Sequence, residues 1–207
     1  MSWRLYGVRG WGSVLAEAAL AWVGAPFEFV DVEGFDRPGP ARDRLLGVNP
    51  LARVPTLAGK NGETLTESAA IMLRLAELYP ASGLAPEPGD ALRPAYLNRL
   101  MWFVSVLYPT FTYRDYPERW APDAADQLAE RVDAFRQSLW LQFEAEVGDG
   151  DWVLAERPSA LDIYVAAMSQ WRPRRKWIAA NCPKLQRIAL NAEALPALAP
   201  VMKRNFG

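Results

Sequence analysis

The sequence predicts an α/β domain at the N-terminus followed by an all-α helical domain, and three observations support this division. Short segments with the character of strands occur only before residue 66. Residues 81–89, ASGLAPEPG, form the best linker candidate in the chain. Beyond them, apolar residues recur at helical spacing. We therefore expect an N-terminal domain at 1–80, a linker at 81–90 and a helical domain at 91–207.

The N-terminal domain is expected to begin with a strand, a helix and a second strand. Residues 3–6 are rich in aromatic side chains, as short strands are. Residues 15–22 place apolar side chains at helical spacing, and Gly24 suits the C′ position after that helix. Residues 27–32 alternate as a second strand, parallel to the first through the helical crossover. Residues 33–48 hold at most a short irregular helix.

Residues 49–68, NPLARVPTLAGKNGETLTES, combine an X-Pro step, a short apolar run, a turn and a helix start. Asn61-Gly62 predicts a two-residue hairpin turn between strands at 56–58 and 64–65, because both residues tolerate positive φ. A helix is expected from about Thr66 to Tyr79, with hydroxyls and a carboxylate complementing its free backbone N–H groups. The element order βαβαββα is the thioredoxin-like arrangement.

The rest of the chain is predicted to be helical. The expected helices lie at about 90–108, at about 123–147, at 159–171, from Cys182 onward, and at 195–203. The helix at 159–171 is apolar on nearly all sides, so we expect it to be the buried centre of the second domain. Ser159 and Asp162 fit a capping box at its start and are interpreted as structural.

The composition excludes several kinds of chemistry and of partner. The chain has 207 residues, with 23 basic and 24 acidic side chains, and a net charge of −1 argues against nucleic acid as a partner. No apolar run approaches the roughly 18 residues of a membrane span. The chain has no histidine, which excludes Ser-His or Cys-His catalysis and histidine-ligated metal. Its single cysteine, Cys182, cannot form an internal disulfide, so we expect a cytoplasmic location.

The segment VPTL at 54–57 followed by TES at 66–68 resembles the glutathione-binding signature of the soluble, bacterial-like glutathione transferases. Supporting matches are spread along nearly the whole chain. The resemblance implies a homodimeric detoxification enzyme that uses glutathione as a substrate, without a metal, and adds its thiolate to a small hydrophobic electrophile. The alternative is a non-catalytic protein of the same fold that binds glutathione or a hydrophobic ligand. A glutathione-dependent disulfide reductase is disfavoured, because the N-terminal turn has no cysteine.

The same resemblance assigns the glutathione-binding residues. It implies that Val54 pairs its backbone N–H and C=O with the cysteinyl part of glutathione and that Pro55 is cis. Glu67 and Ser68 would hold the γ-glutamyl amino and carboxylate groups. Arg53 would reach the glycyl carboxylate.

The sequence offers several candidates for the residue that activates the thiol. The positions where family members carry a catalytic serine or cysteine fall at about Gly10 and at Gly12, which have no side chain. Ser13 is the only hydroxyl in this turn and the first candidate, with a helix N-cap as its structural alternative. Tyr6 is the rival candidate, and Arg9 is a third.

The backbone can also supply the donors, through the N–H groups of residues 11–13. Trp11 would then shield the site from water. The resemblance implies that the second substrate sits between the domains, and the residues expected to line its cleft are aromatic: Trp11, Tyr108, Phe111 and Tyr113. Tyr108 to Tyr116 is predicted to be a kinked helix end, with core or dimer packing as the alternative role of its aromatic side chains. The basic run at 171–176 is expected to be a solvated corner.

Overall fold

The computed structural model describes residues 2–155 and 157–207, which form two compact units. The first contains the chain up to Glu87 together with Glu193–Gly207, and the second is Pro88–Ala192. The sequence predicted a helical domain that runs to residue 207. The structure instead groups the C-terminal segment with the N-terminal unit, so this unit contains a helix that the sequence did not assign to it.

The first unit is built on a four-stranded sheet with the strand order β2-β1-β3-β4. β1 runs parallel to β2 and antiparallel to β3, and β3 runs antiparallel to β4. This topology confirms the predicted thioredoxin-like βαβαββα order. The elements are β1 (Trp3–Gly7), α1 (Ser13–Trp22), β2 (Phe27–Asp31), α2 (Pro40–Leu46), β3 (Thr56–Gly59), β4 (Thr64–Leu65), α3 (Ser68–Leu78), the 3₁₀ turn η1 (Pro80–Ser82) and α10 (Ala199–Phe206).

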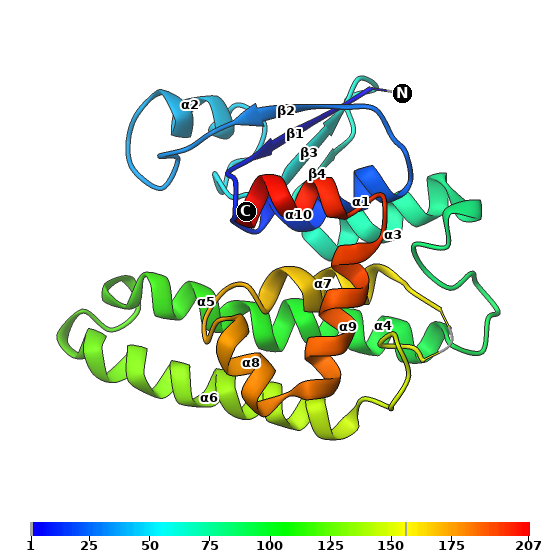
Figure 1. Ribbon diagram of the computed structural model, residues 1–207. Helices are drawn as coiled ribbons and strands as arrows, with labels where there is room; N and C mark the ends of the chain where they lie inside the picture. The colour runs from blue at the N-terminus through cyan, green and yellow to red at the C-terminus, as the bar shows by residue number, and fades with distance from the viewer. Residues whose placement is uncertain (1, 156) are drawn as a thin grey trace. The chain divides into compact units, whose positions relative to one another are not determined.

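Successive residues of a strand point to opposite faces of the sheet, and the helices of the first unit pack on these side chains. α1 contacts α3 beside the sheet, and α10 lies along α1 (Figure 1). One apolar cluster of this unit includes Tyr6 of β1 and Leu45 of α2. Its buried members are Tyr6, Val8, Val32, Phe35, Leu45 and Ala52.

Two glycines with positive φ shape the turns of this unit. Gly24, with φ +68°, follows α1 and donates its N–H to Ala21 O, as the sequence predicts for a C′ residue. Gly62, with φ +84°, closes the hairpin between β3 and β4. The predicted two-residue turn is wrong, because Gly59 N–H bonds to Glu63 O and leaves a three-residue loop at 60–62. Such loops place glycine at their left-handed position.

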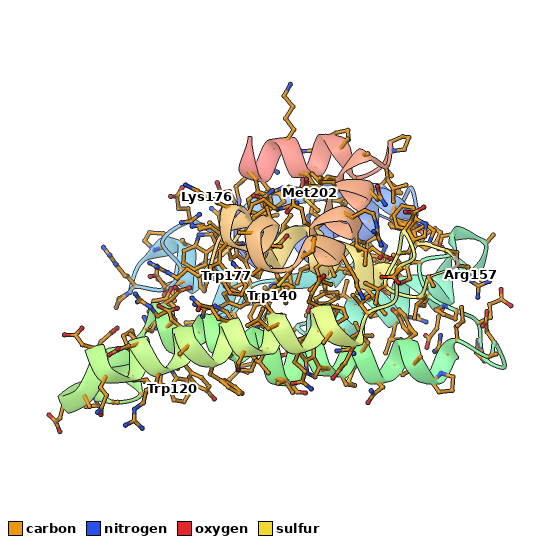
Figure 2. The ribbon with its side chains drawn as sticks, turned by 60° about the horizontal axis from the view of Figure 1, so that its bottom comes forward. Trp120, Trp140, Arg157, Lys176, Trp177 and Met202 are labelled. Atoms are coloured by element: carbon orange, nitrogen blue, oxygen red, sulfur yellow. The ribbon has the colours of Figure 1, made fainter. Side chains whose placement is uncertain are left out.

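All the regular elements described in the second unit are helices, as predicted. Its elements are α4 (Arg93–Trp102), the π-helical segment η2 (Phe103–Leu107), α5 (Tyr108–Asp115), the 3₁₀ turns η3 (Pro117–Arg119) and η4 (Pro122–Ala124), α6 (Ala125–Glu146), α7 (Ala160–Met168), α8 (Arg175–Asn181) and α9 (Pro183–Ala194). Every residue of α7 is buried, which confirms it as the centre of the unit. Trp140 of α6 is fully buried, whereas Trp120 is exposed (Figure 2).

The helix predicted to end near Tyr108 continues to Asp115 through one π-helical segment. Pro109 has no N–H for the carbonyl one turn earlier, and its ring crowds that carbonyl. The wider π turn at 103–107 removes this conflict, and Tyr108 N–H bonds to Phe103 O instead. The helix therefore ends at Asp115 and not near Tyr108, and the predicted aromatic segment lies on its last turns, after the π-helical distortion.

The predicted capping box is present at the start of α7. Ser159 Oγ accepts a hydrogen bond from Leu161 N–H at 3.3 Å, and Asp162 Oδ2 accepts one from Ser159 N–H at 2.7 Å. Asp162 Oδ1 also accepts from Val153 N–H at 2.8 Å, which ties the preceding loop to the helix. None of the helices in the described part of the chain is both long and apolar enough to cross a membrane.

Candidate functional site

Three segments of the first unit meet at one edge of its sheet. Tyr6 at the end of β1 pairs with Thr56 at the start of β3. Leu65 at the end of β4 pairs with Leu57, so β4 leaves the sheet at the same edge. The turn before α1, the loop before β3 and the start of α3 therefore lie together. These segments hold every first-unit site residue that the sequence predicts.

The Ser13 hydroxyl is bonded to the backbone of the turn. Ser13 is buried, donates from Oγ to Val8 O at 2.6 Å and accepts from Val8 N–H at 3.0 Å. The N-cap of α1 is Gly12, which makes no side-chain cap bond, so the predicted N-cap role of Ser13 is wrong. Because the hydroxyl proton is held by Val8 O, Ser13 closes the turn and has no free proton for a ligand.

Two backbone amides at the start of α1 stay open. Gly10 N–H donates to Asn205 Oδ1 at 2.9 Å, and Trp11 N–H donates to Val8 O at 3.2 Å. Within residues 2–155 and 157–207, no acceptor is recorded for the N–H groups of Gly12 and Ser13. These two donors belong to the positive end of the α1 dipole, where an anion is stabilised.

The other two catalytic candidates are engaged elsewhere. The Tyr6 ring is only 8% exposed and belongs to the apolar cluster under α2. Arg9 bonds through Nη1 to Glu17 Oε1 at 2.9 Å, and its guanidinium lies 4.4 Å from the centre of the Phe29 ring. The contacts of Tyr6 and Arg9 therefore indicate a structural role for both residues.

Asn49 organises the loop before β3, a role that sequence reasoning missed. Its Nδ2 donates to Arg53 O at 3.1 Å and to Thr56 Oγ1 at 2.9 Å, while its Oδ1 accepts from Leu51 N–H at 3.0 Å. Thr56 Oγ1 also donates to Arg53 O at 2.8 Å. Asn49 and Thr56 are buried, so this small network fixes the backbone that enters β3. The signal in the sequence was an asparagine directly before a proline, which is also an ordinary turn pattern.

Val54 presents an open backbone beside this network. The Val54–Pro55 peptide bond is cis, the isomer that the resemblance implies. β3 begins only at Thr56, and no bond is recorded from the N–H or C=O of Val54 to any residue that the structure describes. A half-buried residue with both groups open at a strand end can pair with an extended peptide, as in strand addition. The Arg53 side chain next to it is exposed.

The start of α3 differs from the prediction in its first residues. α3 begins at Ser68, and Glu67 is its N-cap with extended φ −107° and ψ 131°. The Glu67 side chain makes no cap hydrogen bond to the backbone of the helix. Glu67 is exposed and Ser68 is buried. Glu67 therefore lies just after β4, at the same edge of the sheet as the loop that carries Val54.

The aromatic residues expected to line a second-substrate cleft lie in separate clusters. In the first unit, Trp11 is 41% exposed and its ring centre lies 5.6 Å from that of Phe35. Of the aromatic residues predicted in the second unit, Tyr113 is partly exposed and pairs with Trp120 at 4.9 Å. Trp11 and Tyr113 are thus the more exposed members of the predicted set.

The other two members, Tyr108 and Phe111, share one partner. Their ring centres lie 5.9 Å and 5.1 Å from that of Trp171. Phe111 is 7% exposed, so its ring is mainly part of the packing of the second unit. Within the second unit, the structure brings these two predicted cleft residues together.

A charged network behind these rings ties α5 to α6. Arg136 is buried, pairs with Asp133 and donates from Nη1 to Thr110 O at 3.1 Å. Arg114 Nε bonds to the same Asp133 at 2.7 Å. Partial desolvation by its neighbours raises the pKa of the Asp115 carboxyl, against the lowering effect of the surrounding arginines. The network holds the aromatic segment in place.

The described residues contain neither a cluster of metal ligands nor an ionised cysteine. No group of three or more His, Cys, Asp or Glu side chains among them could hold a metal ion. Cys182 is fully buried, and burial, with Glu144 adding to the effect, raises the pKa of its thiol to about 12. At neutral pH Cys182 is therefore a protonated core residue.

Comparison with known proteins gives concordant results. The family model described as "Glutathione S-transferase, N-terminal domain" matches residues 13–83. The "Uncharacterized GST-like protein YncG" of Escherichia coli K12 is 42% identical over 202 residues and covers 98% of both chains. A solved sphingomonad glutathione S-transferase complexed with glutathione is 30% identical, with a TM-score of 0.80 and 97% of both chains covered. A Sulfitobacter homologue with bound glutathione has a TM-score of 0.86 at 22% identity, covering 100% of this chain and 99% of its own, and supports the fold alone.

Proposed function

Because the chain belongs to the soluble glutathione transferase family, we propose that it adds the thiolate of glutathione to a small hydrophobic electrophile. One observation carries this proposal. The open backbone of Val54 and the open amides of Gly12 and Ser13 lie at the same sheet edge. A short peptide bound to the first would bring its central residue toward the second. The sphingomonad relative complexed with glutathione supports the choice of peptide.

Each part of glutathione has a candidate partner. Val54 pairs with the cysteinyl backbone, with Asn49 and Thr56 holding the loop behind it. Glu67 and Ser68 hold the γ-glutamyl amino and carboxylate groups, helped by the α3 dipole. Arg53, whose side chain is exposed, reaches the glycyl carboxylate.

In this proposal, the amide N–H groups of Gly12 and Ser13 activate the thiol. Lowering the pKa of a free thiol from about 8.5 by about two units requires about 2.7 kcal/mol of preferential thiolate stabilisation. A hydrogen bond to a charged group contributes about 1.5–3 kcal/mol, and a helix N-terminus adds about 0.3–1 kcal/mol. Two amide donors at the start of α1 are therefore sufficient without a hydroxyl.

For the electrophile, the proposal names one apolar contact in each unit. Trp11 contributes an exposed ring from the first unit, and Tyr108, whose ring packs on the buried Phe111, contributes a half-buried ring from the second. We also propose a cytoplasmic homodimer. The single cysteine supports the compartment, and the family resemblance supports the assembly.

Titration calorimetry with glutathione at neutral pH tests the binding step. We expect a dissociation constant in the millimolar range or below. The dipeptide Cys-Gly should bind more weakly, because it lacks the γ-glutamyl group held by Glu67 and Ser68. No heat with glutathione at millimolar concentration would contradict the proposal.

Glu67→Gln is expected to weaken glutathione binding. Loss of a charged hydrogen bond of about 1.5–3 kcal/mol corresponds to an affinity about 10- to 150-fold lower. The matched control is Glu77→Gln at the other end of α3, where the carboxylate bonds only to Arg74 at 3.4 Å among the described residues. The control should bind glutathione like the wild type. Equal affinities for both variants would remove Glu67 from the site.

Ser13→Ala distinguishes the amide donors from the hydroxyl. Because the residue 13 N–H survives the change, we expect kcat to fall by less than about tenfold, whereas loss of a true side-chain donor costs about 10²–10³ in kcat. The variant should lose about 1–3 kcal/mol of stability, because the Val8 N–H loses its acceptor and the Val8 C=O keeps one bond, from Trp11 N–H, in place of two. Assays are therefore run well below its unfolding temperature. A fall of more than about a hundredfold with folding intact would assign activation to the hydroxyl.

The bonded Ser13 hydroxyl also favours a second candidate function. A protein of this fold with no free hydroxyl in the turn can bind glutathione or a hydrophobic ligand without chemistry. Titration of the bound thiol by its ultraviolet absorbance separates the two. A pKa that stays near about 8.5 supports simple binding, and one lowered toward about 6.5 supports the transferase.

A further inference from the structure

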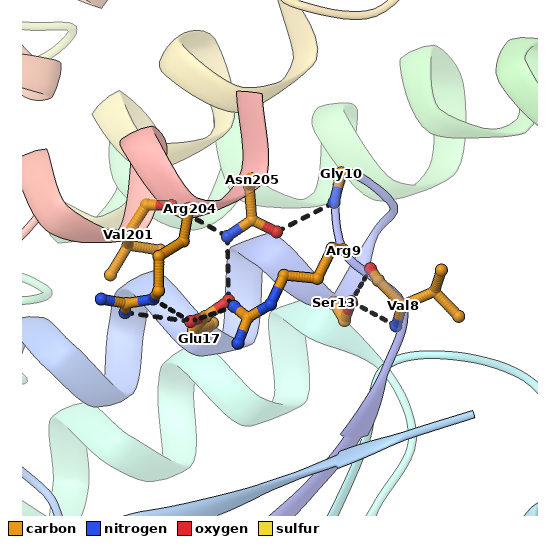
Figure 3. A network of polar contacts seen from close by, with 8 residues as sticks. All are labelled: Val8, Arg9, Gly10, Ser13, Glu17, Val201, Arg204 and Asn205. Atoms are coloured by element: carbon orange, nitrogen blue, oxygen red, sulfur yellow. Dashed lines mark hydrogen bonds and ion pairs between the residues drawn. The ribbon is translucent and has the colours of Figure 1, made fainter. Parts of the chain in front are cut away.

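A buried carboxylate joins the C-terminal helix to the turn before α1. Glu17, one turn into α1, is 1% exposed. Its carboxylate accepts hydrogen bonds from Arg9 Nη1 at 2.9 Å, from Arg204 Nη2 at 3.0 Å and from Asn205 Nδ2 at 2.9 Å (Figure 3). Arg204 and Asn205 belong to α10, 187 and 188 residues further along the chain. A buried carboxylate is tolerated when it is paired and hydrogen-bonded, and here three side chains provide this.

Asn205 connects this carboxylate to the backbone of the turn. Its Nδ2 donates to Glu17 Oε2 at 2.9 Å and to Val201 O at 2.9 Å, and its Oδ1 accepts from Gly10 N–H at 2.9 Å. The amide can take only this orientation, because the reverse would place an oxygen against the Glu17 carboxylate and an N–H₂ group against Gly10 N–H. Glu17 thus orients Asn205, and Asn205 holds Gly10.

Gly10 is suited to this contact in two ways. Its φ of +75° favours glycine, and a Cβ there would lie 3.2 Å from the backbone oxygen of Asn205. Glycine also occupies position 12, so the backbone of this turn has high conformational freedom in isolation. Gly10 is fixed from the α10 side and Ser13 from the Val8 side. The open amides of Gly12 and Ser13 lie directly after Gly10 in the chain.

We propose that Asn205 is a positioning residue for thiol activation, and that Glu17 is the residue that holds it in place. This inference rests on the proposed function. Asn205 fixes the peptide at Gly10 so that the N–H groups of Gly12 and Ser13 are preorganised around the glutathione sulfur. α10, which the sequence assigned to the helical domain, thereby completes the catalytic turn.

The charge of the cluster acts in the same direction. Two guanidinium groups and one carboxylate leave a net charge of +1 beside the N-terminus of α1. A net positive charge adds to the helix dipole in favouring a thiolate over a thiol. The glutathione-holding residues Val54, Glu67 and Ser68 lie on other segments. Loss of Asn205 should therefore affect the thiol and spare the binding of the peptide.

Asn205→Ala is the test, with Lys203→Ala as the matched control. Lys203 is an exposed residue of the same helix, and no side-chain bond is recorded for it in the described part of the chain. We expect Asn205→Ala to lower kcat by about 10- to 100-fold, because small errors in donor placement have effects of this size. The apparent pKa of the bound thiol should rise toward about 8.5, while KM for glutathione stays within about twofold. Lys203→Ala should match the wild type in kcat, in KM for glutathione and in the pKa of the bound thiol.

A purely structural role for Asn205 would lower stability but would leave the pH profile of kcat and the pKa of the bound thiol unchanged, and that result overturns the inference. If Asn205→Ala does not fold, amide hydrogen exchange in the wild type decides. The Gly10 amide should exchange as slowly as the amides of α1, and exchange at the free rate overturns the proposal. Absence of glutathione binding by the wild type, in contrast, contradicts the proposed function itself.

Discussion

Replacing Asp162 by alanine is expected to lower the free energy of unfolding by about 3–5 kcal/mol, because the change leaves several buried donors without an acceptor. The carboxylate accepts from Val153 N–H at 2.8 Å and from Ser159 N–H at 2.7 Å, and Asp162 is fully buried. These bonds cap α7 and hold the preceding loop against it. Since α7 is the buried centre of its unit, a frayed start would disturb the whole unit. Denaturant unfolding measures the effect.

The pH dependence of this effect has a definite sign. Burial raises the pKa of Asp162 to about 6 from an ordinary value of 3.8, against the lowering effect of its hydrogen bonds. The folded state therefore holds the proton more tightly than the unfolded state. The additional stability that comes from protonating Asp162 is full below about pH 4 and is lost as pH rises through about 6. The difference in stability between the wild type and Asp162→Ala should widen by about 1–3 kcal/mol as pH falls from 7 to 4.

Asp149→Ala is the control for Asp162. Its side chain is 90% exposed, and the one ion pair recorded for its carboxylate among the described residues is a 3.3 Å surface pair with Lys184. Such pairs contribute about 0–1 kcal/mol, so this variant should unfold like the wild type at every pH. If Asp162→Ala were as stable as this control, the capping box would have no part in stabilising the unit.

The sequence predicts the fold well because strand and helix patterns are local. The parallel β1 and β2, the αL residue Gly24, the capping box and the buried α7 all follow from spacing and residue type. The predictions are wrong where a contact with a distant element, or the geometry of the preceding element, determines the structure. α10 joins the first unit through pairing with Glu17, which spacing along the chain cannot show. The helix through Pro109 continues only because a π turn precedes it.

In the candidate site too, some residues follow from a local motif and others only from contacts in the folded chain. The sequence motif places Val54, Glu67 and Ser68 at the sheet edge, and the register of the strands brings them to the turn before α1. The role of Ser13 could not be read from the sequence. A serine at a helix start looks like an N-cap or a nucleophile, and only the position of Val8 shows that its hydroxyl closes the turn. Asn205 was missed for the same reason, since its partners lie at the other end of the chain.

Gly7→Ala is expected to be the most damaging small substitution in the first unit. A Cβ at position 7 would lie 2.4 Å from Ser13 Cβ and 2.7 Å from Ser13 Oγ. The clash is with the backbone-proximal part of a side chain at the start of α1, which cannot rotate away, so the helix start itself must move. We expect a loss of about 2–4 kcal/mol in unfolding free energy and a fall in kcat of more than about 100-fold, because the bonds of Ser13 to Val8 break and the open amides shift.

Two further variants make this prediction specific to contact between residues 7 and 13. Gly47→Ala is the matched control in the same unit, because Gly47 has φ −64° and a Cβ there would meet only Arg44 O at 3.4 Å and Asp43 O at 3.9 Å. It should be neutral or slightly stabilising, since alanine restricts the unfolded chain. Adding Ser13→Gly to Gly7→Ala removes the clashing Cβ and should restore part of the lost stability, a non-additivity of about 1–3 kcal/mol. Strict additivity of the two substitutions would show that Gly7 is required for some other reason. A positive coupling would show that glycine at position 7 makes room for the serine that closes the turn.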